Sequence, residues 1–299
     1  MFRSRLIEVP HAPSCIHALS DESQKPIGMF DSGVGGLTVV AALARRRPQE
    51  RVVYVADQGH VPYGGRPLDQ IQRFARGITS MLAQEGVKAI VMACNISSAT
   101  TWREQADLYG HHRVFGMIDP GARRAVAASK TGCIGVLATA GTVASGAYTN
   151  AIRSLNAGAK VVEVPCPKFV PLVEGQRTET AAAQDAARAY LAPIERAGCD
   201  VVVLGCTHYP YLLPALTHEA RAPLIFIDPA EAVIEDLSDA LDRNALTATE
   251  NTDHHRLLTT GDPHKFAAQV PRFLPGNGSP VHGIQWHADE TSSPKSGTS

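Results

Sequence analysis

Two short apolar runs, each followed by a cysteine, constrain the fold of this chain more than any other feature. Residues 89–92 read Ala-Ile-Val-Met and lead to Cys94. Residues 201–204 read Val-Val-Val-Leu and lead, through one glycine, to Cys206. Short apolar runs bounded by small residues are typical of buried strands in a parallel sheet. Because open α/β sheets bind ligands beyond the carboxyl ends of their strands, we predict that both thiols face one crevice.

Strands and helices alternate along most of the chain, and the second half repeats the plan of the first. The apolar run 133–137 repeats the run 27–30. This alternation predicts an α/β fold of two similar lobes, with mainly parallel sheets flanked by helices and the active site in the cleft between the lobes. The predicted divisions are a flexible leader (1–25), a first lobe (26–96 and 208–274), a second lobe (97–207) and a disordered tail (275–299) rich in Gly, Ser, Pro, Thr and His.

Composition excludes several classes of protein. The 299 residues are 44% hydrophobic and 19% charged, with a formal net charge of −1, which gives no electrostatic case for nucleic acid or an anionic membrane. No apolar segment reaches about 18 residues and the first residues do not resemble a signal peptide, so we expect a cytoplasmic protein without membrane contact. Six cysteines without a C-x-x-C pair are expected to be free thiols in that compartment, with no structural metal site.

The two strand-end cysteines permit acid/base chemistry. Backbone N–H groups at the start of a helix lower the pKa of a nearby thiol. Either cysteine alone would be read as a buried structural thiol, but the matched positions of Cys94 and Cys206 favour a functional pair. Two such groups on opposite sides of a carbon can remove a proton from one face and return a proton to the other. Nucleophilic acyl transfer by Cys206 and His208 is the open alternative.

Three further motifs each have a structural and a functional interpretation. Asp31 opens the glycine-rich turn 31–36, which either caps the following helix or binds a substrate carboxylate while Asp31 binds an ammonium group or orients a thiol. The glycine spacing does not match a dinucleotide fingerprint or a P-loop. Residues 62–64 form either a simple turn or a pocket wall. Glu174, taken alone, is typical of a surface carboxylate.

Five motifs, in this order, resemble those of glutamate racemases of the aspartate/glutamate racemase superfamily. They are Ile-Gly-Met-Phe-Asp-Ser-Gly-Val-Gly-Gly-Leu (27–37), Val-Pro-Tyr-Gly (61–64), Ala-Cys-Asn (93–95), Phe-Val-Pro-Leu-Val-Glu (169–174) and Gly-Cys-Asp-Val-Val-Val-Leu-Gly-Cys-Thr-His-Tyr-Pro (198–210). The resemblance extends from about Pro26 to Leu274 and leaves only the two ends of the chain outside it.

The resemblance implies a metal-free racemase without cofactor that interconverts L- and D-glutamate and supplies D-glutamate for peptidoglycan. It also implies a bacterial cytoplasmic homodimer. By motif, Cys94 and Cys206 are the two acid/base thiols. Asp31 would assist Cys94, and His208 would assist Cys206 with Glu174 nearby. The implied substrate contacts are Asp31, Ser32, Tyr63, Gly64, Asn95, Ile96, Thr207 and His208.

One position departs from the family pattern. The family usually has Thr after Cys-Asn, and this chain has Ile96. Loss of a hydrogen bond to a charged group costs on the order of 1.5–3 kcal/mol, or about tenfold to a hundredfold in binding. Two alternatives therefore stay open: a racemase of another small acidic amino acid such as aspartate, or a relative without activity that binds a partner. The intact Cys94, Cys206 and His208 favour catalysis.

We expect either Cys94→Ser or Cys206→Ser to abolish racemisation in both directions while the fold stays intact. Each direction uses one thiol as base and the other as acid, and a serine hydroxyl is a far weaker acid than a thiol. Initial rates from each enantiomer and a circular dichroism spectrum provide the test. Near-wild-type rates in both directions for either variant would contradict the two-thiol scheme.

Overall fold

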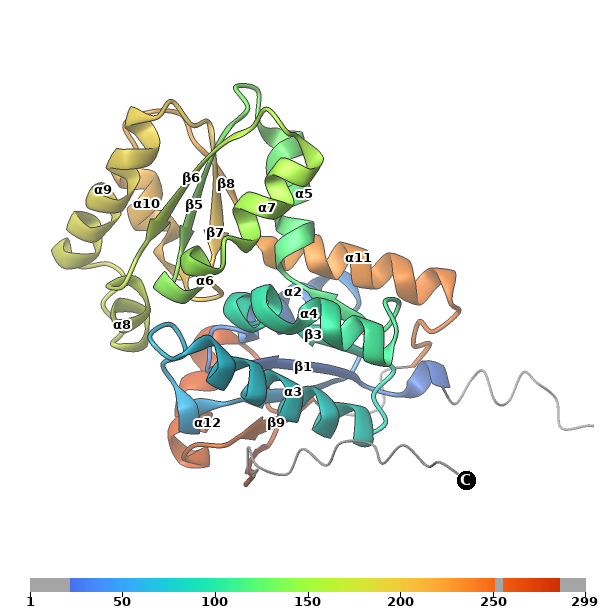
Figure 1. Ribbon diagram of the computed structural model, residues 1–299. Helices are drawn as coiled ribbons and strands as arrows, with labels where there is room; N and C mark the ends of the chain where they lie inside the picture. The colour runs from blue at the N-terminus through green and yellow to red at the C-terminus, as the bar shows by residue number, and fades with distance from the viewer. Residues whose placement is uncertain (1–21, 251–254, 286–299) are drawn as a thin grey trace, which may run out of the picture.

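The computed structural model describes residues 22–250 and 255–285, which form two α/β lobes (Figure 1). The first sheet has the strand order β10 (Val281–Gly283), β9 (Arg256–Thr259), β2 (Val52–Ala56), β1 (Ile27–Asp31), β3 (Ala89–Met92) and β4 (Val114–Gly116). The second sheet has the order β6 (Lys160–Pro165), β5 (Cys133–Ala138), β7 (Val201–Gly205) and β8 (Ile225–Ile227). Neighbouring strands pair in parallel throughout both sheets, as predicted.

Helices cover both faces of the first sheet. One face carries α2 (Leu37–Arg46), α11 (Pro229–Arg243) and α12 (Pro263–Phe273), and the other carries α3 (Leu68–Gln84) and α4 (Asn95–Tyr109). Within β1, Ile27 and Met29 belong to the core with α2, whereas Phe30 belongs to the core with α3. Side chains alternate between the faces of a strand, so a sheet that is covered on both sides needs apolar residues at successive positions. This explains the unbroken apolar runs in the sequence.

The second sheet is covered in the same way. On one face lie α5 (Ile118–Ala128) and α7 (Ala147–Leu155), and on the other lie α9 (Ala181–Arg196) and α10 (Leu213–Glu219). The remaining short helices are η1 (Gln58–His60), α6 (Ala140–Ser145), α8 (Phe169–Glu174) and η2 (Tyr209–Leu212). In the described ranges, no helix is both long enough and apolar enough to cross a membrane.

The predicted internal repeat is confirmed by the topology. The order β2-β1-β3-β4 in the first sheet matches the order β6-β5-β7-β8 in the second. By this correspondence β3 is equivalent to β7, so Cys94 and Cys206 follow equivalent strands. The carboxyl ends of these two strands face the space between the lobes, and the repeat thereby brings one cysteine from each lobe to the same cleft.

The predicted lobe limits are wrong in detail. Strand β4 belongs to the first sheet and strand β8 to the second, although the predicted limits placed 97–207 in the second lobe and 208–274 in the first. After β3 and after β7, the chain forms helix and then returns to the same sheet. It adds β4 beside β3 and β8 beside β7, each in parallel. The chain therefore changes lobe near α5 and again near α11, which contacts both α2 and α5.

The predicted ends also need correction. Residues 281–283 of the predicted disordered tail form β10, which pairs with β9 at the sheet edge. A strand of three residues is too short to give a recognisable period in sequence. Residue Ser23 of the predicted leader is buried. Residues 1–21 of the predicted leader and 286–299 of the predicted tail lie outside the described residues.

A buried ion pair connects four separate segments of the chain. The Nζ atom of Lys88 lies 2.6 Å from Glu50 Oε2, and both side chains are almost fully buried. The same ammonium donates to the carbonyl oxygens of Ser23 and Leu246, at 2.6 and 2.8 Å. Glu50 in turn accepts the N–H of Ala248 at 2.9 Å. Burial lowers the pKa of Lys88, and the contact with Glu50 opposes this shift.

We expect Lys88→Met to lower the free energy of unfolding by about 3–5 kcal/mol, because it leaves the Glu50 carboxylate buried without its cation. Urea unfolding followed by circular dichroism measures this change. The matched control is Arg73→Met, which removes an exposed partner of Asp69 and should change stability by less than about 1 kcal/mol. Adding Glu50→Met to the Lys88 variant should restore part of the loss. A Lys88 variant as stable as the control would refute the structural role of the pair.

Candidate active site

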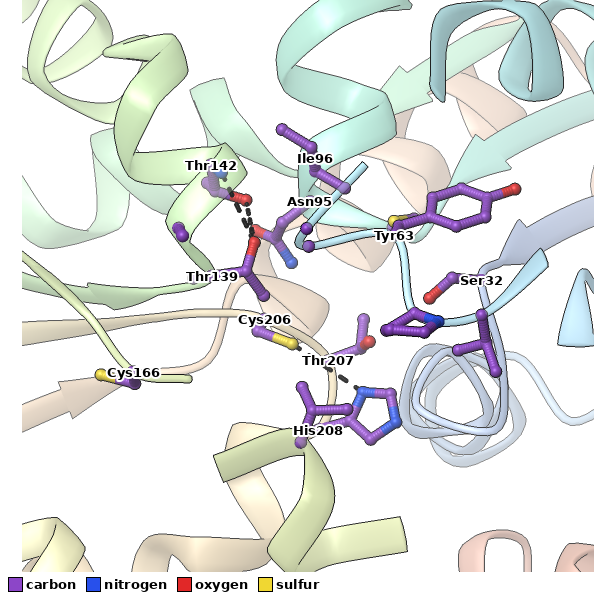
Figure 2. Close-up of a pocket in the computed structure, with 18 of the residues that line it drawn as sticks. Ser32, Tyr63, Asn95, Ile96, Thr139, Thr142, Cys166, Cys206, Thr207 and His208 are labelled. Atoms are coloured by element: carbon purple, nitrogen blue, oxygen red, sulfur yellow. Dashed lines mark hydrogen bonds between the residues drawn. The ribbon is translucent and has the colours of Figure 1, made fainter. Parts of the chain in front are cut away.

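A cavity of about 330 Å³ lies between the two lobes. Its lining comes from loops and helix starts at the carboxyl ends of strands in both sheets (Figure 2). Ten of the predicted site residues line it: Asp31, Ser32, Tyr63, Gly64, Cys94, Asn95, Ile96, Cys206, Thr207 and His208. The volume is in the range of small-molecule sites. The structure therefore brings the predicted residues together, and Glu174 contacts the group through His208.

Cys94 lies at the N-cap position of α4 and is only 5% exposed. Burial, together with the negative charge of Asp31, raises the pKa of this thiol. The side chain and backbone N–H of Ser97, in the first turn of α4, favour the thiolate and lower the pKa. Asp31 and Ser97 therefore act on the Cys94 thiol in opposite directions, in addition to the larger effect of burial. Asp31 is the charged neighbour that a bound cation would neutralise.

Cys206 is the first member of a chain of polar contacts. Its Sγ atom lies 3.8 Å from Nδ1 of His208, and Nε2 of His208 lies 2.8 Å from Oε1 of Glu174 (Figure 2). The other carboxylate oxygen of Glu174 accepts a hydrogen bond from Gln269 in α12, at 3.3 Å. The next members, His208, Glu174 and Gln269, come from three separate segments of the chain, so their contact depends on the tertiary fold.

His208 is held in its protonated form. Burial by itself disfavours the imidazolium, but contacts with Cys206 and Glu174 and the charge of Asp31 raise the pKa of His208 to about 10. An imidazolium beside a thiol stabilises the thiolate and can also supply a proton. The predicted assistance of His208 to Cys206 stays a prediction about catalysis, and the geometry provides the contact that it requires.

Asp31 has the structural role considered for it from sequence, and its contact with a substrate ammonium or a thiol stays a prediction. Its Oδ2 atom accepts the N–H of Gly36 at 2.8 Å, at the start of α2. The same oxygen accepts the hydroxyl of Thr207 from the second lobe at 3.1 Å. The carboxylate therefore orders the glycine-rich turn and connects the lobes at the edge of the cavity.

Gly35 permits this close approach of the lobes. A Cβ atom at Gly35 would lie 2.4 Å from Oγ1 of Thr207 and 2.5 Å from Nδ1 of His208. Both distances are shorter than real Cβ contacts, so any side chain here would displace the second lobe or the His208 ring. Gly35 therefore serves packing between the lobes.

Tyr63 does not offer its hydroxyl to the cavity. The hydroxyl donates to Asp57, which also accepts the hydroxyl of Thr260 at 2.7 Å. Figure 2 shows the hydroxyl end of the Tyr63 ring directed away from Cys206. A substrate contact by Tyr63 would thus use its backbone or ring. Ile96 packs in a small apolar cluster with the ring of Tyr63, so its side chain forms part of an apolar wall.

Sequence reasoning missed some residues of the cavity wall. Thr139 caps α6 by accepting the N–H of Thr142, and the two hydroxyls are 3.0 Å apart (Figure 2). These threonines occupy the second-lobe turn that corresponds to the Asp31 turn. The internal repeat could therefore have indicated that they line the cavity. Cys166 also lines the cavity, and burial raises the pKa of its thiol.

The donor set of the cavity suits a small anionic ligand. The described part of the chain contributes no Lys or Arg to the lining, so a carboxylate would be bound by hydroxyl, amide and backbone N–H groups. The same described residues contain no group of three or more His, Cys, Asp or Glu with metal-binding geometry. One thiol from each lobe, each with its own polar neighbours, can exchange protons with a ligand held between them.

Comparison with protein families gives a match to the Asp/Glu/hydantoin racemase family over residues 36–237. The chain is 44% identical over 248 residues to a glutamate racemase of Gloeobacter violaceus, a match that covers 83% of this chain and 92% of that protein. It is 37% identical over 262 residues to a glutamate racemase of Desulforudis audaxviator, covering 85% and 96% of the two chains.

Solved structures of glutamate racemases also resemble this chain. Glutamate racemase isoform RacE1 from Bacillus anthracis superimposes with a TM-score of 0.84 at 33% identity, covering 88% of this chain and 98% of that one. Glutamate racemase from Francisella tularensis, solved in complex with D-glutamate, has a TM-score of 0.82 at 29% identity, covering 89% and 99%. The two-lobed architecture is thus shared with these proteins.

We expect Glu174→Gln to lower the pKa of His208 from its value of about 10, because the variant removes a carboxylate that favours the imidazolium. The ring of the variant should therefore lose its proton at a lower pH than the wild-type ring. An NMR titration of ¹³C-labelled histidine, with the His208 signal assigned from His208→Gln, measures both values. The control Glu179→Gln removes an exposed carboxylate nearby in sequence and should leave the titration unchanged. Identical curves for wild type and Glu174→Gln would rule out this coupling.

Proposed function

Since this chain belongs to the Asp/Glu/hydantoin racemase family, we propose that it is a glutamate racemase that interconverts L- and D-glutamate by proton transfer at the α carbon. The product D-glutamate supplies peptidoglycan synthesis. The observation that carries the proposal is the placement of Cys94 and Cys206 on one cavity from opposite lobes. The curated relatives named above, each matched over most of its length, support glutamate as the substrate.

The reaction needs one base and one acid on opposite faces of the substrate. In one direction, a cysteine thiolate takes the α proton, so that an S–H bond forms as the Cα–H bond breaks. The electron pair left on the substrate spreads onto the adjacent carboxylate. The second cysteine then donates its thiol proton to the other face and becomes a thiolate. The reverse reaction exchanges the roles of the two sulfurs.

Each thiol has a different neighbouring group that assists its proton transfer. Burial and the charge of Asp31 both raise the pKa of Cys94. Asp31 can bind the substrate ammonium, which would offset its own contribution to that rise. His208, supported by Glu174, lies beside Cys206 and stabilises its thiolate. The two sites are therefore chemically unequal, although both use sulfur as the acid/base atom.

The remaining site residues bind the substrate carboxylates in this proposal. Ser32 and Asn95 provide side-chain donors, and the backbone N–H groups of Gly64 and Ile96 add neutral donors at the turn before α3 and the start of α4. The hydroxyl of Thr207 donates to Asp31, so Thr207 would contact the substrate through its backbone. Ile96 contributes no hydroxyl, so the Asn95 amide becomes the principal side-chain donor at this helix start. The apolar wall around Ile96 lowers the local dielectric constant, which strengthens the hydrogen bonds that remain.

The expected homodimer and cytoplasmic location stay parts of the proposal. A homodimer would be measured as a particle of about twice the chain mass of 31.9 kDa by size-exclusion chromatography with light scattering. A monomer at micromolar concentration would remove the dimer from the proposal and leave the reaction unaffected.

The decisive experiment incubates purified, reduced protein with L-glutamate in deuterated water, without added cofactor. We expect the α-proton signal to disappear from the NMR spectrum while optical rotation decays to zero, since each turnover takes its new α hydrogen from a thiol that exchanges with solvent. L-aspartate is the comparison substrate and should exchange far more slowly. Folded protein that exchanges neither enantiomer of glutamate would refute the proposed function, and faster exchange of aspartate would change its substrate.

A further inference from the structure

A tyrosine outside the cavity lining contacts one of its donors. The hydroxyl of Tyr148, in α7 of the second lobe, donates a buried hydrogen bond of 2.7 Å to Oδ1 of Asn95, in α4 of the first lobe. We propose that Tyr148 is a positioning residue that fixes the Asn95 amide with its NH₂ group toward a substrate carboxylate. This inference deepens the proposed function and rests on it for the identity of the substrate.

The structure holds the Tyr148 ring in a narrow slot. The side chain is fully buried. A Cβ atom at Gly205, at the end of β7, would lie 3.1 Å from Cε2 of the ring, and one at Gly121 in α5 would lie 3.4 Å from Cε1. Two glycines on different elements therefore give the ring its space. The ring has little freedom to turn its hydroxyl elsewhere, so the direction of the hydrogen bond is set by packing.

The chemistry of the pair fixes which end of the amide faces the cavity. Burial, followed by the nearby charge of Asp228, raises the pKa of Tyr148 well above its usual value, so the phenol keeps its proton. In the structure this hydroxyl donates to Oδ1 of Asn95. A donor selects the carbonyl oxygen of the Asn95 amide. The NH₂ group must then point the other way, and Figure 2 shows this nitrogen on the side of Asn95 that faces Cys206.

The Asn95 NH₂ group is available for a ligand. Asn95 is 4% exposed and lines the cavity, and its Nδ2 atom has no hydrogen-bond partner among the described residues. A buried donor without a partner is costly, so such a group in a cavity indicates a site for an acceptor. A flipped amide would instead present oxygen lone pairs to the carboxylate and repel it.

The contact also joins the lobes. Tyr148 and Asn95 belong to different lobes, so the hydrogen bond exists only when the lobes are placed as they are here. A lobe movement that opened the cavity would release the amide and leave it free to flip. The tyrosine thereby makes the orientation of a substrate donor depend on the relative placement of the two lobes.

Tyr148→Phe tests the proposal, since phenylalanine fits the same slot and removes only the hydroxyl. We expect KM for glutamate to rise roughly tenfold to a hundredfold, with kcat changed by less than about fivefold, because the lost contact serves substrate binding more than proton transfer. In an Asn95→Ala background, Tyr148→Phe should have little further effect, because the tyrosine acts through the amide. The matched control is Tyr109→Phe at the other end of α4, which should keep wild-type kinetics.

A second readout does not depend on activity. In ¹⁵N-labelled protein, the Asn95 side-chain amide signals, assigned from their loss in Asn95→Ala, should shift or broaden in Tyr148→Phe and stay unchanged in Tyr109→Phe. Unchanged amide signals, or KM effects that simply add in the double variant, would overturn the role of Tyr148. Wild-type protein that fails to exchange glutamate would overturn the proposed function instead, and the amide signals would still decide whether Tyr148 orients Asn95.

Discussion

The hydrogen bond from Thr207 to Asp31 is the contact on which the geometry of the cavity depends. One carboxylate oxygen serves the first turn of α2 and the second lobe at the same time. It can do so only because Gly35 lets Thr207 and His208 approach the turn without a Cβ atom in the way. A side chain at Gly35 would therefore displace Thr207 and the His208 ring, which lies beside Cys206. Local backbone chemistry at the end of β1 thus controls the spacing of groups that are far apart in sequence.

The internal repeat supplies a nearly symmetric scaffold, and the side chains make it unequal. The strands β3 and β7 hold equivalent positions, and each is followed by a cysteine. The partners differ: a carboxylate lies near Cys94, and an imidazolium supported by Glu174 lies beside Cys206. A chiral substrate presents different groups to the two walls, so unequal partners fit an enzyme that must process both enantiomers in one cavity.

Local sequence patterns predicted the parallel two-lobed fold and the shared crevice of Cys94 and Cys206, because strand ends and helix starts are encoded within a few positions. The motif resemblance implied most of the other cavity residues. Contacts between distant segments could not be predicted in that way. Gln269 contacts Glu174 from α12, and Tyr148 contacts Asn95 from the other lobe. The hydroxyl of Tyr63 is occupied by Asp57, which the turn sequence alone did not indicate. The lobe limits were misplaced because β4 lies in the same sheet as β3, and β8 in the same sheet as β7, whereas the predicted limits divided each pair between the lobes.

The described lining of the cavity offers an anionic ligand no Lys or Arg side chain. Dissolved ions weaken attraction between exposed charges over about 10 Å at 0.1 M salt, but they act little on short hydrogen bonds in a water-poor cavity. Affinity for the substrate should therefore vary little with the ionic strength of the surroundings. Neutral donors also release a carboxylate more readily than a guanidinium would. A reversible catalyst that must discharge either enantiomer benefits from both properties.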